Sequence, residues 1–104
     1  MHTTFDNPAA FSIIMPLYNQ EQFVAESIQS ILDQTLGDWE LIIVDDGSTD
    51  DSGNIAESFA ARDDRITVLH QANVGRAGAR TTGIARATGA GLAYLDGADL
   101  WFPD

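Results

Sequence analysis

The 104-residue chain contains no cysteine and no lysine. The absence of cysteine excludes disulfides, thiolate nucleophiles and sulfur-based zinc sites, and it leaves the redox compartment open. Five arginines carry all of the formal positive charge against sixteen acidic residues, which gives a net charge of −11. A field of that sign repels phosphate backbones, so the composition argues against nucleic acid as a partner.

Long apolar runs are also missing from the chain. No run approaches the roughly 18 residues that a membrane-spanning helix requires, so we expect no membrane segment. The opening MHTTFDNPAA lacks the basic region and apolar core of a secretory signal. We therefore expect a cytoplasmic protein, at the cytoplasmic face of a membrane if the parent protein is membrane-bound. The length predicts one domain, over 11–104, preceded by a loose tail over 1–10.

Short apolar runs alternate with amphipathic segments after this tail. Buried-strand patterns cover 11–15, 39–44, 66–69 and 91–95, and helical patterns cover 19–34, the segment around 55–60, and 76–88. Asn19, with Gln22 three residues later, is the expected cap of the first helix. The order βαβαβαβ predicts an α/β fold, a Rossmann-like open parallel sheet with helices on both faces.

Polar residues gather where each predicted strand ends, over 16–19, 45–48, 70–75 and 96–99. Ligands of open α/β sheets bind beyond the carboxyl ends of the strands. Asp, Asn, Gly and Ser are also ordinary turn formers, which is the simpler interpretation of any single loop. Four polar loops on one edge favour a binding site. His70 is expected there as a rim or packing residue, because no metal-ligating neighbours accompany it in the sequence.

Three nucleotide and phosphate sites fit the sequence poorly. The loop after the first strand, PLYNQE, has no glycine, which excludes a dinucleotide fingerprint. The segment GARTTGIA has the glycine spacing of a phosphate loop without its Lys and Ser/Thr. The acid pair at 45–46 also suits the magnesium site of a phosphoacceptor receiver, but receiver chemistry needs a lysine.

Four motifs together resemble the nucleotide-sugar-binding half of a family-two glycosyltransferase with the GT-A fold. They are P-x-Y-N at 16–19, V-D-D-G-S-x-D at 44–50, N-x-G-x-x-x-A-R-x-x-G at 73–83 and L-D-x-x-D at 95–99. The resemblance covers nearly all of 11–104. The substrate-binding residues that it implies are Pro16, Leu17, Tyr18, Asp45, Asp46, Arg80, Asp96 and Gly97.

The resemblance also implies roles for these residues. The P-x-Y-N segment lines the base and ribose of a nucleotide-sugar donor, Asp46 accepts hydrogen bonds from the uracil edge, and Asp45 shapes the turn. Arg80 lies near the phosphates. A carboxylate suits a base edge because it accepts hydrogen bonds from ring N–H groups.

The fourth loop departs from the family's pattern. Family members carry D-x-D there, and its last acid binds the manganese or magnesium that bridges the donor phosphates. This chain has Asp96, Gly97 and Ala98 at those positions, and an alanine side chain offers no oxygen ligand. Asp96 and Asp99 are the remaining candidate ligands for a divalent metal.

The resemblance implies the donor-binding half of an inverting glycosyltransferase that uses a nucleotide diphosphate sugar, with uracil as the expected base. The general base belongs to an acceptor half that this chain is expected to lack, so we assign no catalytic residue and expect no transfer by the chain alone. The acceptor is undetermined. An uncovered sheet favours a homo-oligomer. The alternative is a non-catalytic GT-A-like interaction or assembly module that has lost its metal site, which Ala98 suggests.

Overall fold

The computed structural model describes residues 11–33, 38–89 and 91–94. Strands and helices alternate along these ranges as the sequence predicts. The elements are β1 (Phe11–Leu17), α1 (Val24–Leu32), β2 (Trp39–Asp46), α2 (Ser52–Ala60), β3 (Ile66–Gln71), α3 (Arg76–Arg86) and β4 (Gly91–Tyr94). The expected tail over 1–10 and the fourth loop over 95–99 lie outside the described residues.

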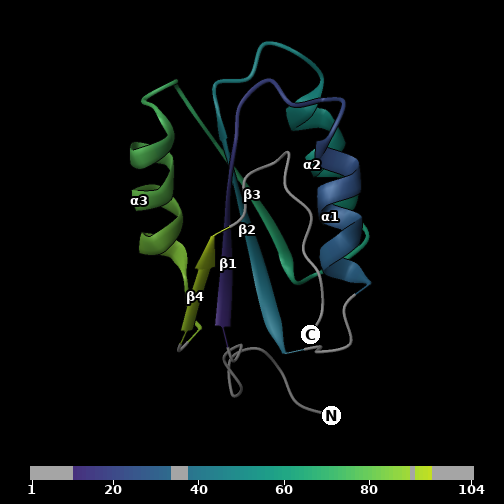
Figure 1. The fold of residues 1–104 in the computed structure, drawn as a ribbon, viewed down its shortest axis with the longest axis vertical. Helices are drawn as coiled ribbons and strands as arrows, with labels where there is room; N and C mark the ends of the chain where they lie inside the picture. The colour runs from purple at the N-terminus through teal and green to yellow at the C-terminus, as the bar shows by residue number, and fades with distance from the viewer. Residues whose placement is uncertain (1–10, 34–37, 90, 95–104) are drawn as a thin grey trace.

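All four described strands run parallel in one sheet with the order β3-β2-β1-β4. Figure 1 shows α1 and α2 together on one side of the sheet and α3 on the other. The predicted α/β fold with helices on both faces is confirmed. Within the described residues, no helix has the length and apolarity to cross a membrane.

Alternating side chains of β1 and β2 build two cores, one on each face of the sheet. Ile13, Met15 and Leu17 face α1 and α2, whereas Ile14 packs on the opposite face with Ala79 of α3. Successive strand residues point to opposite faces, so a nearly continuous apolar run is what a strand covered on both faces requires. Each fully buried aliphatic side chain contributes about 1.5–3 kcal/mol.

Gly83 allows α3 to approach the sheet closely. A Cβ atom at this position would lie 2.6 Å from Cγ2 of Ile14 and 3.4 Å from Cγ2 of Val44. Glycine costs roughly 1 kcal/mol relative to alanine inside a helix, and this close packing explains its presence.

Several element boundaries differ from the sequence-based prediction. The first helix begins at Val24 rather than near Asn19, and its N-cap, Phe23, makes no side-chain capping hydrogen bond. The side-chain oxygen of Asn19 instead accepts hydrogen bonds from the backbone N–H groups of Thr49 and Asp50, in the loop after β2. β1, β2 and β3 each continue two residues further than predicted. In β2 and β3 the added residues are polar and still complete the strand pairing, as Asp46 does opposite Gln71, whereas in β1 they are Pro16 and Leu17.

Candidate functional site

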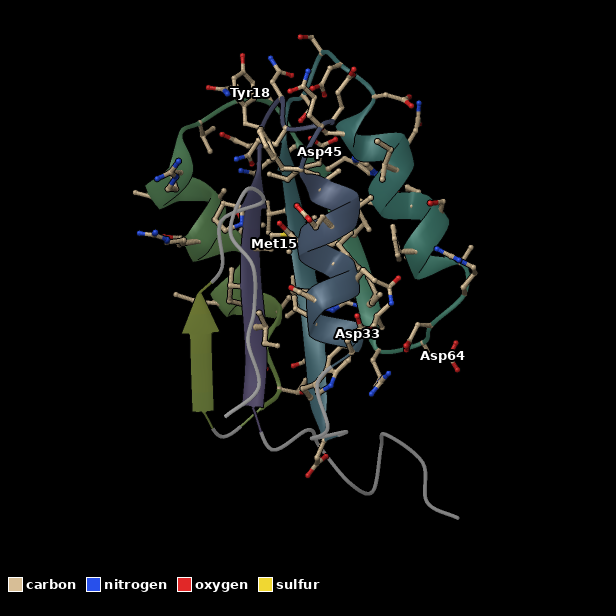
Figure 2. The ribbon with its side chains drawn as sticks, turned by 45° about the vertical axis from the view of Figure 1, so that its right-hand side comes forward. Met15, Tyr18, Asp33, Asp45 and Asp64 are labelled. Carbon is tan, nitrogen blue, oxygen red and sulfur yellow. The ribbon has the colours of Figure 1, made fainter. Side chains whose placement is uncertain are left out.

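The parallel arrangement brings the carboxyl ends of β1, β2 and β3 to one edge of the sheet. Figure 2 shows Tyr18 and Asp45 at this end of the molecule, while Asp33 and Asp64 lie at the opposite end. The loop after β1, the loop after β2 and the start of α3 meet at this edge. The described polar segments of 16–19, 45–48 and 70–75 are therefore gathered as the sequence predicts.

Asp45 and Asp46 are the last two residues of β2, and their side chains serve opposite faces of the sheet. The oxygens of Asp45 accept hydrogen bonds from the Ser48 backbone N–H (3.1 Å) and face the His70 ring (3.0 Å) on the α2 side. Asp46 instead contacts the segment that leads into α3. Strand alternation thus gives two adjacent acids separate environments.

Only 3% of the surface of Asp46 is exposed. Its carboxylate binds the segment that connects β3 to α3. Its Oδ1 accepts hydrogen bonds from Gln71 Nε2 (3.0 Å) and the Val74 N–H (2.9 Å), and its Oδ2 accepts one from the Gly75 N–H (2.9 Å). Gly75 has φ 92 at the N-cap of α3, which is accessible to glycine at little cost.

The charge of Asp46 is favoured despite its burial. Desolvation raises the pKa of this carboxyl, but the hydrogen bonds from Gln71, Val74 and Gly75 together outweigh it and hold the pKa below its usual value. The side chain is therefore an anion at neutral pH, able to accept hydrogen bonds and unable to donate one.

A hollow of about 200 Å³ opens beside Asp46. Four predicted substrate-binding residues line it together with four that the motifs did not assign. The lining residues are Pro16, Leu17, Tyr18, Gln20, Asp46, Asn73, Gly75 and Arg76. An apolar wall facing one buried carboxylate suits a flat, partly polar group such as a nucleobase.

Two other predicted residues lie outside this lining. Asp45 belongs to the α2 side of the sheet, where it contacts Ser48 and His70. Arg80 is exposed on α3, four positions after the lining residue Arg76 and thus on the same side of the helix. Asp96, Gly97, Ala98 and Asp99 fall outside the described residues.

His70 has carboxylate partners that its sequence neighbours do not reveal. Its Nδ1 lies 3.0 Å from Asp45 Oδ2 and its Nε2 lies 2.6 Å from Glu57 Oε2 of α2. The hydrogen bonds with Glu57 and then Asp45 raise the pKa of His70 and favour the imidazolium, which donates through both nitrogens. The sequence predicts His70 at the rim because it follows a strand pattern, whereas the contact with Glu57 of α2 is evident only in the folded chain.

Metal ligands are not assembled in the part of the chain that the structure describes. No group of three or more His, Cys, Asp and Glu side chains there is arranged to hold a metal ion. The oxygens of Asp46, the one acid lining the hollow, already accept three hydrogen bonds from protein groups. The described residues by themselves therefore do not fit a metal.

Comparison with known proteins identifies this architecture. The family model for glycosyl transferase family 2 matches residues 12–104. The chain belongs to this family. Among curated relatives, the uncharacterized glycosyltransferase EpsJ of Bacillus subtilis is 54% identical over 88 residues, which are 85% of this chain and 26% of EpsJ. Glycosyltransferase GlyG of Streptococcus pneumoniae is 42% identical over 90 residues, or 86% of this chain and 30% of GlyG.

Solved glycosyltransferase structures share the fold and confirm the expected GT-A architecture. TarS of S. aureus (1–349), in complex with UDP-GlcNAc, superimposes with a TM-score of 0.81 at 29% identity, over 86% of this chain and 27% of TarS. The mannosyltransferase PcManGT from Pyrobaculum calidifontis, in complex with GDP-Man and Mn2+, gives a TM-score of 0.83 at 26% identity, over 88% and 28%. This chain thus spans under a third of each of these relatives.

Proposed function

We propose that this chain forms the donor-binding part of an inverting glycosyltransferase and that its donor is a UDP-sugar. The observation that carries the proposal is the hollow in which Asp46 faces the apolar wall formed by Pro16, Leu17 and Tyr18. The uracil ring would stack on this wall and donate its N3–H to Asp46. The complex of TarS with UDP-GlcNAc supports a donor of this class.

The hydrogen bonds of Asp46 favour uracil over guanine. A carboxylate offers about four acceptor positions, and three on Asp46 are filled by Gln71, Val74 and Gly75. About one position remains, on Oδ2. Uracil presents a single N–H donor between two carbonyl acceptors, whereas guanine presents adjacent N1–H and N2–H donors that call for both oxygens. The geometry therefore suits UDP better than GDP.

The diphosphate would extend from the base toward the start of α3. Arg76 lines the hollow and Arg80 follows one turn later, so both cations lie on the path of an anionic group leaving this site. A divalent metal, when bound, neutralises the diphosphate as the leaving group departs. In this chain only Asp96 and Asp99 of the fourth loop are assigned as its ligands, with Ala98 between them.

Calorimetric titration of the full chain tests the proposed donor. UDP should bind measurably tighter than GDP, with Asp51→Asn as a variant that removes one exposed charge of the neighbouring loop and leaves the preference unchanged. Equal or tighter binding of GDP would contradict the assignment of Asp46.

A non-catalytic interaction module is the second candidate, and Ala98 is the observation that favours it. The variant Ala98→Asp restores the D-x-D sequence of the family. Manganese-dependent tightening of UDP binding in this variant supports a damaged enzyme site. UDP binding that is undetectable in both forms supports the interaction module.

A further inference from the structure

The loop after β1 is joined to the loop after β2 by hydrogen bonds centred on Asn19. Its side-chain Oδ1 accepts hydrogen bonds from the backbone N–H groups of Thr49 (2.8 Å) and Asp50 (3.3 Å). Its own backbone N–H donates to Ser48 Oγ (3.1 Å). We call these contacts the Asn19 clamp. Two loops about thirty residues apart in the sequence are thereby held together.

Asn19 has a left-handed backbone conformation, which is uncommon for a residue other than glycine. Its φ of 49 lies in the left-handed region, and in the part of the chain that the structure describes no other residue except glycine has a positive φ. Asparagine tolerates this conformation better than most residues, although glycine adopts it at the lowest cost. Glycine, however, could not supply the amide oxygen. This position requires both a left-handed φ and a side-chain acceptor, and asparagine provides both.

The clamp adjoins the hollow along the chain. Tyr18 and Gln20, the two chain neighbours of Asn19, both line the hollow, whereas Asn19 does not. Tyr18 is 48% exposed, so core packing does not fix its ring. Leu17, fully buried at the end of β1, anchors the chain before Tyr18, and the hydrogen bond from the Gln20 N–H to Ser52 Oγ (2.7 Å) anchors the chain after the clamp. Asn19 is therefore the anchor directly after Tyr18.

We propose that Asn19 is a positioning residue for donor binding, which holds the Tyr18 ring over the base site by fastening its backbone to the loop after β2. The inference rests on the proposed function and extends it, because Asn19 contributes to nucleotide affinity without touching the nucleotide. The acceptor oxygen is the part of the side chain that matters. Removing it releases the backbone next to Tyr18 while leaving the sheet and both cores intact.

Two variants separate the oxygen from the backbone conformation. Asn19→Gly keeps the left-handed φ accessible and removes the acceptor, whereas Asn19→Asp retains an acceptor oxygen at the same position. We expect Asn19→Gly to bind UDP about tenfold more weakly, as the loss of one to two hydrogen bonds predicts. Asn19→Asp should stay within about threefold of the wild type. Thermal unfolding followed by circular dichroism verifies that both variants are folded at the titration temperature.

A double-mutant cycle with Tyr18→Ala shows whether Asn19 acts through Tyr18. In the Tyr18→Ala background, adding Asn19→Gly should change UDP affinity by less than about twofold. A purely structural Asn19 would instead lower the melting temperature and leave UDP affinity unchanged. That result, or a full tenfold loss in the Tyr18→Ala background, overturns the inference while the proposed function stands. A wild-type chain that binds no UDP refutes both.

Discussion

Replacing Asp46 with asparagine tests whether the hydrogen bonds of the Asp46 carboxylate stabilise the connection between β3 and α3. Asparagine keeps the shape of the side chain, removes the charge and replaces one oxygen with an NH2 group. If the remaining oxygen faces Gln71 and Val74, the NH2 group meets the Gly75 N–H, which lies 2.9 Å from Oδ2 in the native chain. Two donors then oppose each other in a buried site.

The expected loss of stability follows from these contacts. One hydrogen bond to a charged acceptor is lost, at about 1.5–3 kcal/mol, and two others change from charged to neutral acceptors, at about 1–1.5 kcal/mol each by the same scale. Because the contacts share one side chain and are not additive, we expect a total of roughly 2–4 kcal/mol. Each kilocalorie corresponds to about 4–8 °C in the melting temperature of a domain of this size.

Urea unfolding of the wild type and Asp46→Asn at pH 7 measures this difference. Asp51→Asn is the control, because Asp51 is an exposed acid at the N-cap of α2 whose carboxylate accepts a surface hydrogen bond from Asn54 Nδ2 (2.9 Å). The pH dependence supplies a second readout. The pKa of Asp46 is lowered by folding, so its contribution is present above the ordinary aspartate pKa and is lost as the pH falls through the folded value. A change below about 0.5 kcal/mol for Asp46→Asn at pH 7 would refute the account, since it would equal an ordinary surface substitution.

Two further predictions concern contacts away from the hollow. His70→Gln should lower the free energy of unfolding by about 0.5–1 kcal/mol, a modest loss because the His70 and Glu57 side chains are half exposed. The contribution of His70 is complete below pH 6.5 and disappears as the pH rises through its raised pKa. Urea unfolding should therefore give the same stability for wild type and variant at high pH. Gly83→Ala should destabilise by about 1–2 kcal/mol, because overpacking against Ile14 exceeds the gain in helix propensity. Gly78→Ala is its comparison and should destabilise less, since the two atoms that its Cβ would meet, Cγ2 (2.6 Å) and Cβ (3.3 Å) of Val74, belong to an exposed side chain rather than to the core. A comparable loss there would contradict the packing argument.

The sequence predicted the fold because its strongest signals are local. Nearly continuous apolar runs such as Ile13–Met15 require strands covered on both faces, and the alternation of elements then determines the parallel sheet. Strand ends were harder to predict. Asp45 and Asp46 resemble turn residues in sequence, yet they complete β2, because backbone pairing with β3 does not depend on side-chain polarity.

Short motifs single out only part of the lining of the hollow. The motifs single out Leu17 and Asp46, which line the hollow, whereas Gln20 and Arg76, which also line it, carry no comparable signal. The role of Asn19 was misassigned, since a helix cap and a contact between two loops call for the same residue type. Contacts of this kind form between loops that are far apart in the sequence, and no local sequence pattern shows which loops will meet.

The central claim is that the hollow beside Asp46 receives the uracil of a donor nucleotide. The most direct measurement is a titration of the 15N-labelled chain with UDP, followed through its backbone amide signals. The account predicts that the largest shifts fall on Tyr18, Val74 and Gly75, because these groups line the hollow or donate to Asp46. Saturating UDP that leaves these three amides unmoved, or that shifts residues at the opposite edge of the sheet instead, would contradict it.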